Sequence, residues 1–555
     1  MQQIPRWELF ERSLKSGRAY DNPFLEVELE AVFTSGRHRV RVDGFYDGEE
    51  DGCPVWRVRF APPEQGTWRY TTTSNDPDLD GQNGELSCTE PVSGGPLVVN
   101  PQFGNWFFRA DGSPQLIVNE GWYPHPANGR FFSHDDVDYQ QPSEQDMKDY
   151  FCILSGYGVN LVIDIAQLYA RQSTITDTSF RWPWAVVDAA SNRIDKDRFN
   201  LAYYQRMDRV MRVARDNGMF FALELLYDNS VVRPREWSHH PLNTANGGWL
   251  AGNEHGTGWD VMFDCGNAVH VAYTARYLRY TIARLAPYWN VLWSIGSENG
   301  NLIRLPHELL PHALFPAEKA AAWYNHWGDF VGRTDPYGRL RTYGDAGKQP
   351  LMVTTTYNNV IVTQDPRDYR KNDPDAYYQA MNDFGEHFWR YGRPVVIGEM
   401  TAGTGGHYDM ERRLYWIGFV SGYMMGRADR HFAPVVDGKL LESEKFNVAG
   451  DPPIYADLKR MADFILGQDI PFWRMRPADE LLDSSGSMVY CLAARDEVYL
   501  LYFVHGGQVS LSVPQSEYTW FCPSSGKIRE TGSVAAGTAS FTAHDGEDWV
   551  LLLRC

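Results

Sequence analysis

Two apolar runs that each end in a single glutamate limit what this chain can fold into. The run 290–297 is bounded by Pro287 and Gly300 and leads to Glu298. Short apolar runs between proline and glycine are typical of buried strands. A second run, 394–398, leads in the same way to Glu399, roughly a hundred residues later, which leaves room for about three strand–helix units of a (β/α)8 barrel. The strand ends of such a barrel open on one face.

Strand and helix signals alternate through the central region, which predicts parallel βα units. The expected strands are 116–118, 159–164, 220–226, 290–297, 339–343, 351–356, 394–399 and 423–427. The expected helices between them are 144–157, 201–217, 269–285, 317–334, 374–391 and 409–419. These elements make up the eight units of a barrel.

All-β patterns flank the barrel on both sides. Residues 1–97 form short alternating segments separated by Gly, Pro and Asp turns, as in a β-sandwich. Residues 466–555 return to this pattern, with strands expected at 487–493, 497–503, 508–513 and 548–553. The predicted fold class is therefore α/β, a (β/α)8 TIM barrel over 98–465 flanked by two β-sandwich domains.

Composition excludes several classes of partner. The net charge is −19, with 71 acidic against 52 basic residues, whereas nucleic acids and anionic membranes require basic patches. No apolar run is long enough to span a bilayer. The aromatic content of 14% fits carbohydrate binding, although large cores also use aromatic residues.

Cysteine usage and the start of the chain bear on cofactors and location. The seven cysteines form no C-x-x-C pair and are odd in number, so we expect neither a disulfide framework nor a zinc site, and no cofactor. The first residues lack the basic and apolar segments of a signal peptide, which predicts a cytoplasmic protein, or a secreted one if a leader has been trimmed. A homo-oligomer is compatible with the sequence.

Two glutamates on one barrel face suit glycoside hydrolysis. One carboxyl group donates a proton to the leaving oxygen, and the other attacks the anomeric carbon or activates water. A single glutamate at a strand end more often caps a helix or binds an arginine. Two glutamates in matching positions, Glu298 and Glu399, are harder to explain in that way.

Parts of the chain resemble known bacterial enzymes. Segments 7–11, 22–24, 44–47, 59–70 and 76–84 are similar to the immunoglobulin-like N-terminal domain of certain bacterial glycoside hydrolases. The order of sandwich, barrel and sandwich resembles clan A of the retaining glycoside hydrolases. Because that clan carries its acid/base after the fourth strand and its nucleophile after the seventh, the resemblance implies these roles for Glu298 and Glu399.

One position departs from the clan pattern. The clan places an asparagine directly before the acid/base, where it binds the sugar 2-hydroxyl, and this chain has Ser297 there. Either Asn299 makes that contact, or the glycone is an unusual sugar such as a furanose or a deoxy sugar.

Polar and aromatic residues after the expected strands are candidate sugar-binding residues. They are Glu120, Trp122, Tyr123, His125, Asp164, Gln167, Tyr169, Glu224, Tyr227, Asp228, Asn299 and Tyr357. About half of them are expected only to build loops. Tyr357 resembles the clan tyrosine that hydrogen-bonds the nucleophile. Glu224 lies inside an apolar strand and is alternatively a barrel-interior residue paired with Arg339 or Arg341.

The expected partner is an oligosaccharide or polysaccharide substrate, and three alternatives stay open. A carbohydrate-binding protein on a degenerate barrel would most simply have lost one glutamate. An inverting glycosidase would have a wider separation of the two carboxyl groups. A polysaccharide lyase would favour a Tyr, His or Lys base. Histidines 239, 240 and 255 follow the third strand without a nearby carboxylate, so we expect loop or subsite residues rather than metal ligands.

Overall fold

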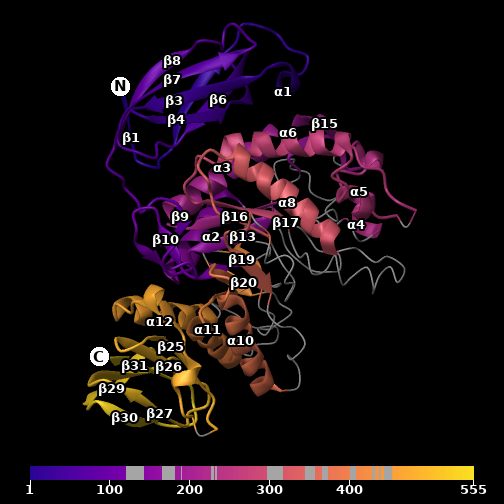
Figure 1. Cartoon of the computed structure of the whole chain (residues 1–555). Helices are drawn as coiled ribbons and strands as arrows, with labels where there is room; N and C mark the ends of the chain where they lie inside the picture. The colour runs from indigo at the N-terminus through magenta and orange to yellow at the C-terminus, as the bar shows by residue number, and fades with distance from the viewer. Residues whose placement is uncertain are drawn as a thin grey trace.

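The structure is a computed structural model, and Figure 1 shows three regions in order along its length. It describes residues 1–120, 143–165, 182–188, 190–226, 231, 234–254, 256–296, 317–343, 355, 357–364, 373–399, 408–427, 432–436, 439–442, 453–484 and 486–555. No helix among these residues is long and apolar enough to cross a membrane.

The N-terminal region consists of two sheets that share one core. The five-stranded sheet has the order β1 (Gln2–Pro5), β8 (Asn83–Thr89), β7 (Gly66–Ser74), β3 (Leu29–Ser35) and β4 (His38–Asp43). The three-stranded sheet has the order β2 (Phe10–Lys15), β6 (Cys53–Phe60) and β5 (Phe45–Glu50), and the short helix α1 (Pro23–Glu26) lies beside it. Alternate side chains point inward, and the Phe33 and Phe60 rings stack at 4.1 Å between the sheets.

A small antiparallel sheet leads into the central region at its amino end. It contains β9 (Leu97–Val99), β10 (Phe107–Arg109) and β11 (Pro114–Gln115). The Arg109 guanidinium lies over the rings of Phe220 and Trp289, at 4.9 and 4.8 Å from their centroids. The antiparallel pair β10–β11 therefore lies at the amino end of the central sheet, before its first strand.

The centre of the molecule is an eight-stranded, all-parallel sheet. Its order is β18 (Arg341–Thr342), β17 (Val291–Gly296), β16 (Phe220–Leu226), β13 (Leu161–Ile165), β12 (Asn119–Glu120), β21 (Met424–Arg427), β20 (Val395–Glu399) and β19 (Ile361–Gln364). The Asn359 N–H donates to the Arg341 carbonyl at 2.9 Å, so the two ends of this order lie side by side. β16 and β17 are buried along their whole length, as is typical of a parallel sheet that is covered on both faces.

Helices alternate with these strands, and the sequence predicts all of them except α12. They are α2 (Glu144–Gly156), α3 (Leu201–Asp216), α6 (Ala268–Leu285), α8 (Ala317–Thr334), α10 (Pro374–Trp389), α11 (Tyr408–Val420) and α12 (Pro453–Gly467). Side chains of Asn200, Asn267 and Asp373 cap the starts of α3, α6 and α10. The caps show why these helices begin where they do.

Additional elements follow the carboxyl ends of three strands. The hairpin β14 (Trp184–Asp188) and β15 (Arg193–Phe199) follows β13, and α4 (Pro234–His239) and α5 (Trp259–Met262) follow β16. The hairpin β22 (Phe432–Val436) and β23 (Lys439–Glu442) follows β21. In Figure 1, α4, α5 and β15 lie on the right and the β9–β11 sheet on the left, so the strands end on the right.

The sixth strand differs from the prediction. The described strand at this position in the sheet is Ile361–Gln364, and residues 355 and 357–360 form no strand. The other residues of the predicted range 351–356 lie outside the described residues. The Asn358 side chain accepts from the Val360 N–H, and the Asn359 side chain accepts from the Arg341 N–H. These asparagines therefore form the turn that starts the strand.

The C-terminal region is again all-β. Its larger sheet has the order β24 (Arg476–Pro477), β25 (Val489–Ala494), β26 (Val498–Phe503), β31 (Trp549–Arg554), β28 (Ser516–Cys522) and β29 (Lys527–Val534). A two-stranded sheet, β27 (Gln508–Val513) and β30 (Gly537–Thr542), packs on the same core. The four strands expected here are confirmed within two residues at each end.

Buried ion pairs join the flanking regions to the centre. Arg59 of β6 and Arg284 of α6 both bind the Asp208 carboxylate of α3, with shortest distances of 2.5 and 2.7 Å. At the other end, Arg412 of α11 binds Asp548 at 2.8 Å. We call Arg59, Asp208 and Arg284 the docking cluster.

Candidate active site

Glu399 is the last residue of β20, as the sequence predicts. The pairing of β19 with β20 shifts between Thr363 and Gln364, so that Gly398 is an extra residue and Glu399 lies opposite Gln364. A bulge of this kind bends the strand end and redirects the residue that follows. The side chain of Glu399 lies outside the described residues.

The strand leading to Glu298 is β17, which ends at Gly296. Glu298 itself lies outside the described residues. Every residue of β17 is buried, and the Trp293 indole N–H donates to Asp335 at 2.9 Å on the side of α8. The start of β19 is hydrogen-bonded to β18, so the order continues from β17 through β18 and β19 to β20. The strand that leads to Glu298 and the strand that ends in Glu399 therefore lie three strand positions apart.

Asn119 ties the first strand to the strand of Glu399, a contact that sequence reasoning missed. Its Nδ2 donates to the Ile397 carbonyl at 3.0 Å, two residues before Glu399. The side chain crosses β21 at Gly426, where a Cβ atom would lie 2.0 Å from Nδ2. The sequence shows only that an asparagine directly follows the apolar run 116–118, and it does not reveal which strand the side chain reaches.

Glu120 lies against α12. The Tyr455 hydroxyl of that helix donates to its Oε2 at 3.1 Å, and both side chains are buried. The Tyr455 ring stacks on Tyr157, which follows α2, with centroids 5.5 Å apart. One part of the Glu120 carboxylate therefore joins the first strand to a surrounding helix.

Glu224 is fully buried in the interior of the sheet. Side-chain alternation along β16 puts it on the same face as Phe220, whose ring contacts Arg109 at the amino end. Ser294 of β17 lies beside it in register. Of the two arginines considered as its partners, Arg339 donates to the Ala286 carbonyl and Arg341 to the Gly328 carbonyl.

Tyr357 lies before the sixth strand, whereas the sequence interpretation placed it after that strand. Its ring is buried against α8, where a Cβ atom at Gly328 would meet it at 2.3 Å. This position puts Tyr357 toward the amino end of β19. The resemblance to the clan tyrosine therefore loses the strand-end placement on which it depended.

Tyr324 of α8 is a second residue that sequence reasoning missed. Its ring is fully buried, and its hydroxyl lies 2.6 Å from where a Cβ atom at Gly296 would be. Gly296 precedes Glu298 by two residues. The missing side chain at Gly296 therefore lets a helix residue support the end of β17.

The remaining candidates are not placed. Trp122, Tyr123, His125, Gln167, Tyr169, Tyr227, Asp228 and Asn299 lie outside the described residues. Asp164 has a described backbone in β13, opposite Leu223, without a described side chain. These residues stay predictions.

The loop histidines show no metal-site geometry within the described residues. Burial lowers the pKa of His240 to about 3, and its Nδ1 accepts from the Leu242 N–H at 3.2 Å. It stacks on Trp237 at 5.4 Å, so it helps to build the loop. No cluster of His, Cys, Asp and Glu in the part of the chain that the structure describes could hold a metal ion. His255 lies outside that part.

Two family profiles match the flanking regions. Residues 3–75 match a "Domain of unknown function (DUF5060)", and residues 477–554 match a "Putative collagen-binding domain of a collagenase". No curated protein matches the chain.

Solved structures match the whole architecture. A "putative glycoside hydrolase" from Bacteroides vulgatus is 17% identical, with a TM-score of 0.70 and full coverage of both chains. A protein described as "Glycoside hydrolase" is 15% identical, with a TM-score of 0.56, covering 83% of this chain and 97% of that one. A glycoside hydrolase family 5 protein from Bacteroides vulgatus is 14% identical, with a TM-score of 0.56 and coverage of 83% and 94%. The chain therefore has the fold of structures described as glycoside hydrolases.

Proposed function

We propose that this chain is a retaining glycoside hydrolase that cleaves an O-glycosidic bond of an oligosaccharide or polysaccharide. One observation carries the proposal. Glu399 ends β20, and β17 leads to Glu298, within an eight-stranded parallel sheet whose fold is shared with glycoside hydrolases. In this proposal Glu298 is the acid/base and Glu399 is the nucleophile.

The proposal includes the architecture. The parallel sheet closes as a (β/α)8 barrel over 98–465, and β-sandwich domains at 1–97 and 466–555 flank it. The contact between Asn359 and Arg341 supports closure, because it joins the two ends of the strand order. Catalytic residues of such barrels come from the carboxyl ends of different strands.

The two carboxyl groups divide the work. Ionised Glu399 attacks the anomeric carbon while Glu298 protonates the leaving oxygen, and Glu298 then deprotonates the water that hydrolyses the glycosyl–enzyme. The negative charge of Glu399 helps Glu298 to keep its proton before the first step. That charge disappears once Glu399 is esterified, so Glu298 becomes a base for the second step.

Two described contacts support the ends of the relevant strands. The Asn119 amide holds the Ile397 carbonyl, two residues before Glu399. Tyr324 packs at Gly296, two residues before Glu298. Rigid support of this kind matters because the separation of the carboxyl groups decides between retention, at about 5–5.5 Å, and inversion, at about 6.5–9.5 Å.

Glutamate-to-alanine variants with added azide test the assignment. Without Glu298, proton donation worth about 10²–10⁴-fold is lost, least for aryl glycosides with good leaving groups. Azide should then attack the glycosyl–enzyme and give a glycosyl azide of retained configuration. In Glu399→Ala azide attacks only once and gives inversion. Glu386→Ala, at an exposed position on α10, is the control and should behave like the unchanged protein.

The configuration of the azide product, measured by NMR, separates the alternatives. The opposite pairing means that the two roles are exchanged. A protein that binds glycans and hydrolyses no member of a panel of aryl pyranosides and furanosides would be a binding protein. Inverted sugar released by the unchanged protein would identify an inverting enzyme. The furanosides in the panel also test whether Ser297 accompanies an unusual glycone.

A further inference from the structure

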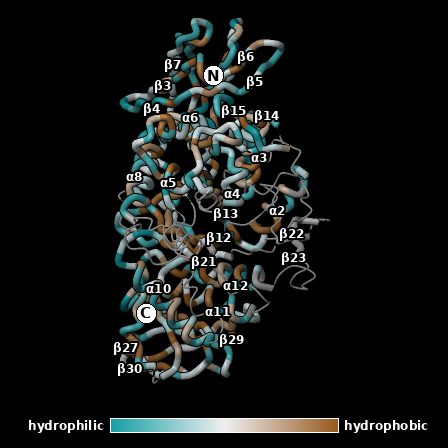
Figure 2. The backbone as a smooth tube through the Cα atoms, turned by 90° about the vertical axis from the view of Figure 1, so that its right-hand side faces the viewer, coloured by the Kyte–Doolittle hydropathy of each residue, from teal (hydrophilic) through white to brown (hydrophobic). Residues whose placement is uncertain are grey.

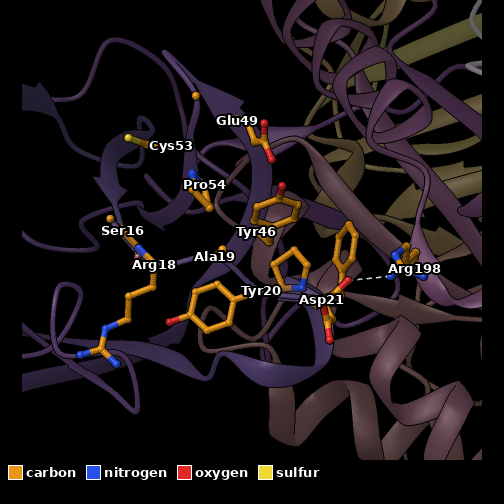
Figure 3. A pocket seen from close by; sticks show the side chains of 14 residues that line it. Ser16, Arg18, Ala19, Tyr20, Asp21, Tyr46, Glu49, Cys53, Pro54 and Arg198 are labelled. Carbon is orange, nitrogen blue, oxygen red and sulfur yellow. Dashed lines mark hydrogen bonds between the residues drawn. The ribbon is translucent and has the colours of Figure 1, made fainter.

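A cavity of about 430 Å³ lies in the N-terminal region, where that region meets β15 (Figure 3). Its volume is in the range of small-molecule sites. The residues that matter for its chemistry are Arg18, Tyr20, Phe24, Tyr46, Glu49 and Arg198. All but Arg198 fall within the segment that matches the domain of unknown function.

The three aromatic rings are held from behind. Trp56, which is fully buried, contacts the Tyr20 ring edge-on at 5.7 Å and the Tyr46 ring at 5.2 Å. The Phe24 ring meets Tyr46 edge-on at 5.0 Å. Each of the three rings is partly exposed at the cavity. Fixed aromatic surfaces of this kind suit the C–H faces of sugar rings, which are apolar while their edges carry hydroxyl groups.

The walls are also held in place by hydrogen bonds. The Tyr20 hydroxyl donates to Asp76 at 2.7 Å, and Arg198 donates to the Asp21 carbonyl at 2.7 Å, the bond drawn in Figure 3. The Asn22 side chain donates to the Asp197 carbonyl at 3.0 Å. A preformed cavity loses little conformational entropy when a ligand binds.

The charges around the cavity are balanced, which argues for a neutral ligand. Arg18 lies 3.9 Å from the buried Asp76 carboxylate, and Arg198 pairs with Asp195 at 2.7 Å. The lining itself contains two arginines, Arg18 and Arg198, and two carboxylates, Asp21 and Glu49. A site for phosphate or for a polyuronate would need arginines directed at the anion.

The cavity lies on the side of the molecule where the parallel strands end. In Figure 1, α1 lies at the right-hand end of the N-terminal region, next to β15, and α4 and α5, which follow the carboxyl end of β16, lie further to the right. Figure 2 views that side directly and shows β5 and β15 above β12 and β13. A long substrate that leaves the proposed active site could therefore run toward the cavity.

We propose that this cavity binds a neutral oligosaccharide segment, by stacking sugar rings on Tyr20 and Tyr46 and by hydrogen bonds to Arg18, Glu49 and Arg198. That this oligosaccharide segment is part of the polysaccharide which the enzyme cleaves rests on the proposed function. The site is separate from the two strand-end glutamates, and it gives the N-terminal region a role in holding the substrate.

Native gel electrophoresis of the full chain through immobilised polysaccharide tests the site. The gels contain neutral polymers (galactomannan, xyloglucan, arabinoxylan or arabinan) or the anionic polymer polygalacturonate. We expect at least one neutral polymer to retard the protein. Tyr20→Ala should weaken that retention roughly tenfold or more, as for other aromatic anchors. Tyr20→Phe should keep it, because the ring remains.

A matched control and a second assay separate this inference from the proposed function. Tyr518→Ala removes another partly exposed tyrosine that donates to a carboxylate, in the C-terminal region, and should not change retention. Tyr20→Ala should keep the kcat/KM for soluble aryl glycosides. Equal retention of Tyr20→Ala and the unchanged protein, retention by polygalacturonate only, or no retention overturns the inference. Retention without hydrolysis of any glycoside would instead refute the proposed function and leave the cavity assignment standing.

Discussion

Removal of the negative charge of Asp208 should weaken the attachment of the N-terminal region by a predictable amount. Asp208 is 2% exposed, and its carboxylate accepts hydrogen bonds from Arg59, Arg284 and Tyr288. Burial raises the pKa of Asp208, but Arg59 and Arg284 lower it by more, from 3.8 to about 2. At 1.36 kcal/mol per pKa unit this difference corresponds to about 2 kcal/mol of the free energy of unfolding.

The sign follows from the lowered pKa. The stabilisation is complete above the unfolded-state value of 3.8 and is lost as the pH falls toward 2. Asp208→Asn, which resembles the protonated acid, should therefore cost about 2 kcal/mol at pH 7, with about half of that difference gone by pH 3. Asp208→Ala should cost about 3–5 kcal/mol, because it leaves two buried guanidinium groups without their partner.

Urea unfolding followed by tryptophan fluorescence at pH 7 and pH 3 measures both effects. Asp216→Asn is the matched control, because Asp216 ends the same helix, pairs with Arg215 and is 64% exposed. It should change the free energy of unfolding by less than about 0.5 kcal/mol. If Asp208→Asn matched this control at pH 7, or if its cost grew toward pH 3, the reasoning would be refuted.

Three further predictions concern packing and titration. Gly296→Ala should lower kcat/KM about tenfold or more, because the added methyl group would push Tyr324 and displace the end of β17. Adding Tyr324→Ala to this variant should restore part of the lost kcat/KM. An unchanged kcat/KM in Gly296→Ala would contradict this role of Gly296. Tyr455→Phe removes a hydrogen-bond donor to Glu120 and should lower the free energy of unfolding, measured in urea, by about 1–2 kcal/mol while KM stays unchanged. A raised KM would instead show that Glu120 contacts substrate. Burial raises the pKa of Asp479 to about 6, so the folded state binds the proton of this carboxyl group more tightly than the unfolded state does. The stabilisation that this proton gives the folded state is therefore lost as the pH rises from about 4 through 6. Relative to Asp479→Asn, the unchanged protein should lose about 2 kcal/mol between pH 4 and pH 7, and parallel pH profiles would refute the assignment.

The strands that sequence reasoning located well are those with continuous apolar runs. Residues 220–226 and 394–399 match β16 and β20 because buried parallel strands are apolar on both faces. The sixth strand was misplaced because two asparagines resemble a strand end as much as a strand start. The hydrogen bonds between Asn359 and Arg341, in the neighbouring strand, decide that the asparagines start the strand. The local sequence does not reveal hydrogen bonds between separate strands.

Residues of the candidate site could be predicted from the sequence only where an apolar strand leads directly to them. The strand-end position of Glu399 follows from the apolar run before it. Asn119 and Tyr324 could not be found in this way, because their positions depend on glycines in other strands. Asn119 passes Gly426, and Tyr324 reaches Gly296, from elements distant in the sequence. A glycine inside a strand signals a close approach without saying what approaches.

The docking cluster also connects the N-terminal region to the strand that leads to Glu298. Arg59 donates to the Arg284 carbonyl at 2.7 Å, at the end of the helix before β17, and the Trp289 indole N–H donates to Glu8 at 3.0 Å. On the far side of β17, the Tyr337 hydroxyl accepts from the Ala61 N–H at 3.1 Å, just before β18. The N-terminal region thus holds the amino ends of both strands, while the proposed chemistry takes place at their carboxyl ends. Asp208→Asn should therefore lower stability far more than it lowers turnover by the molecules that remain folded.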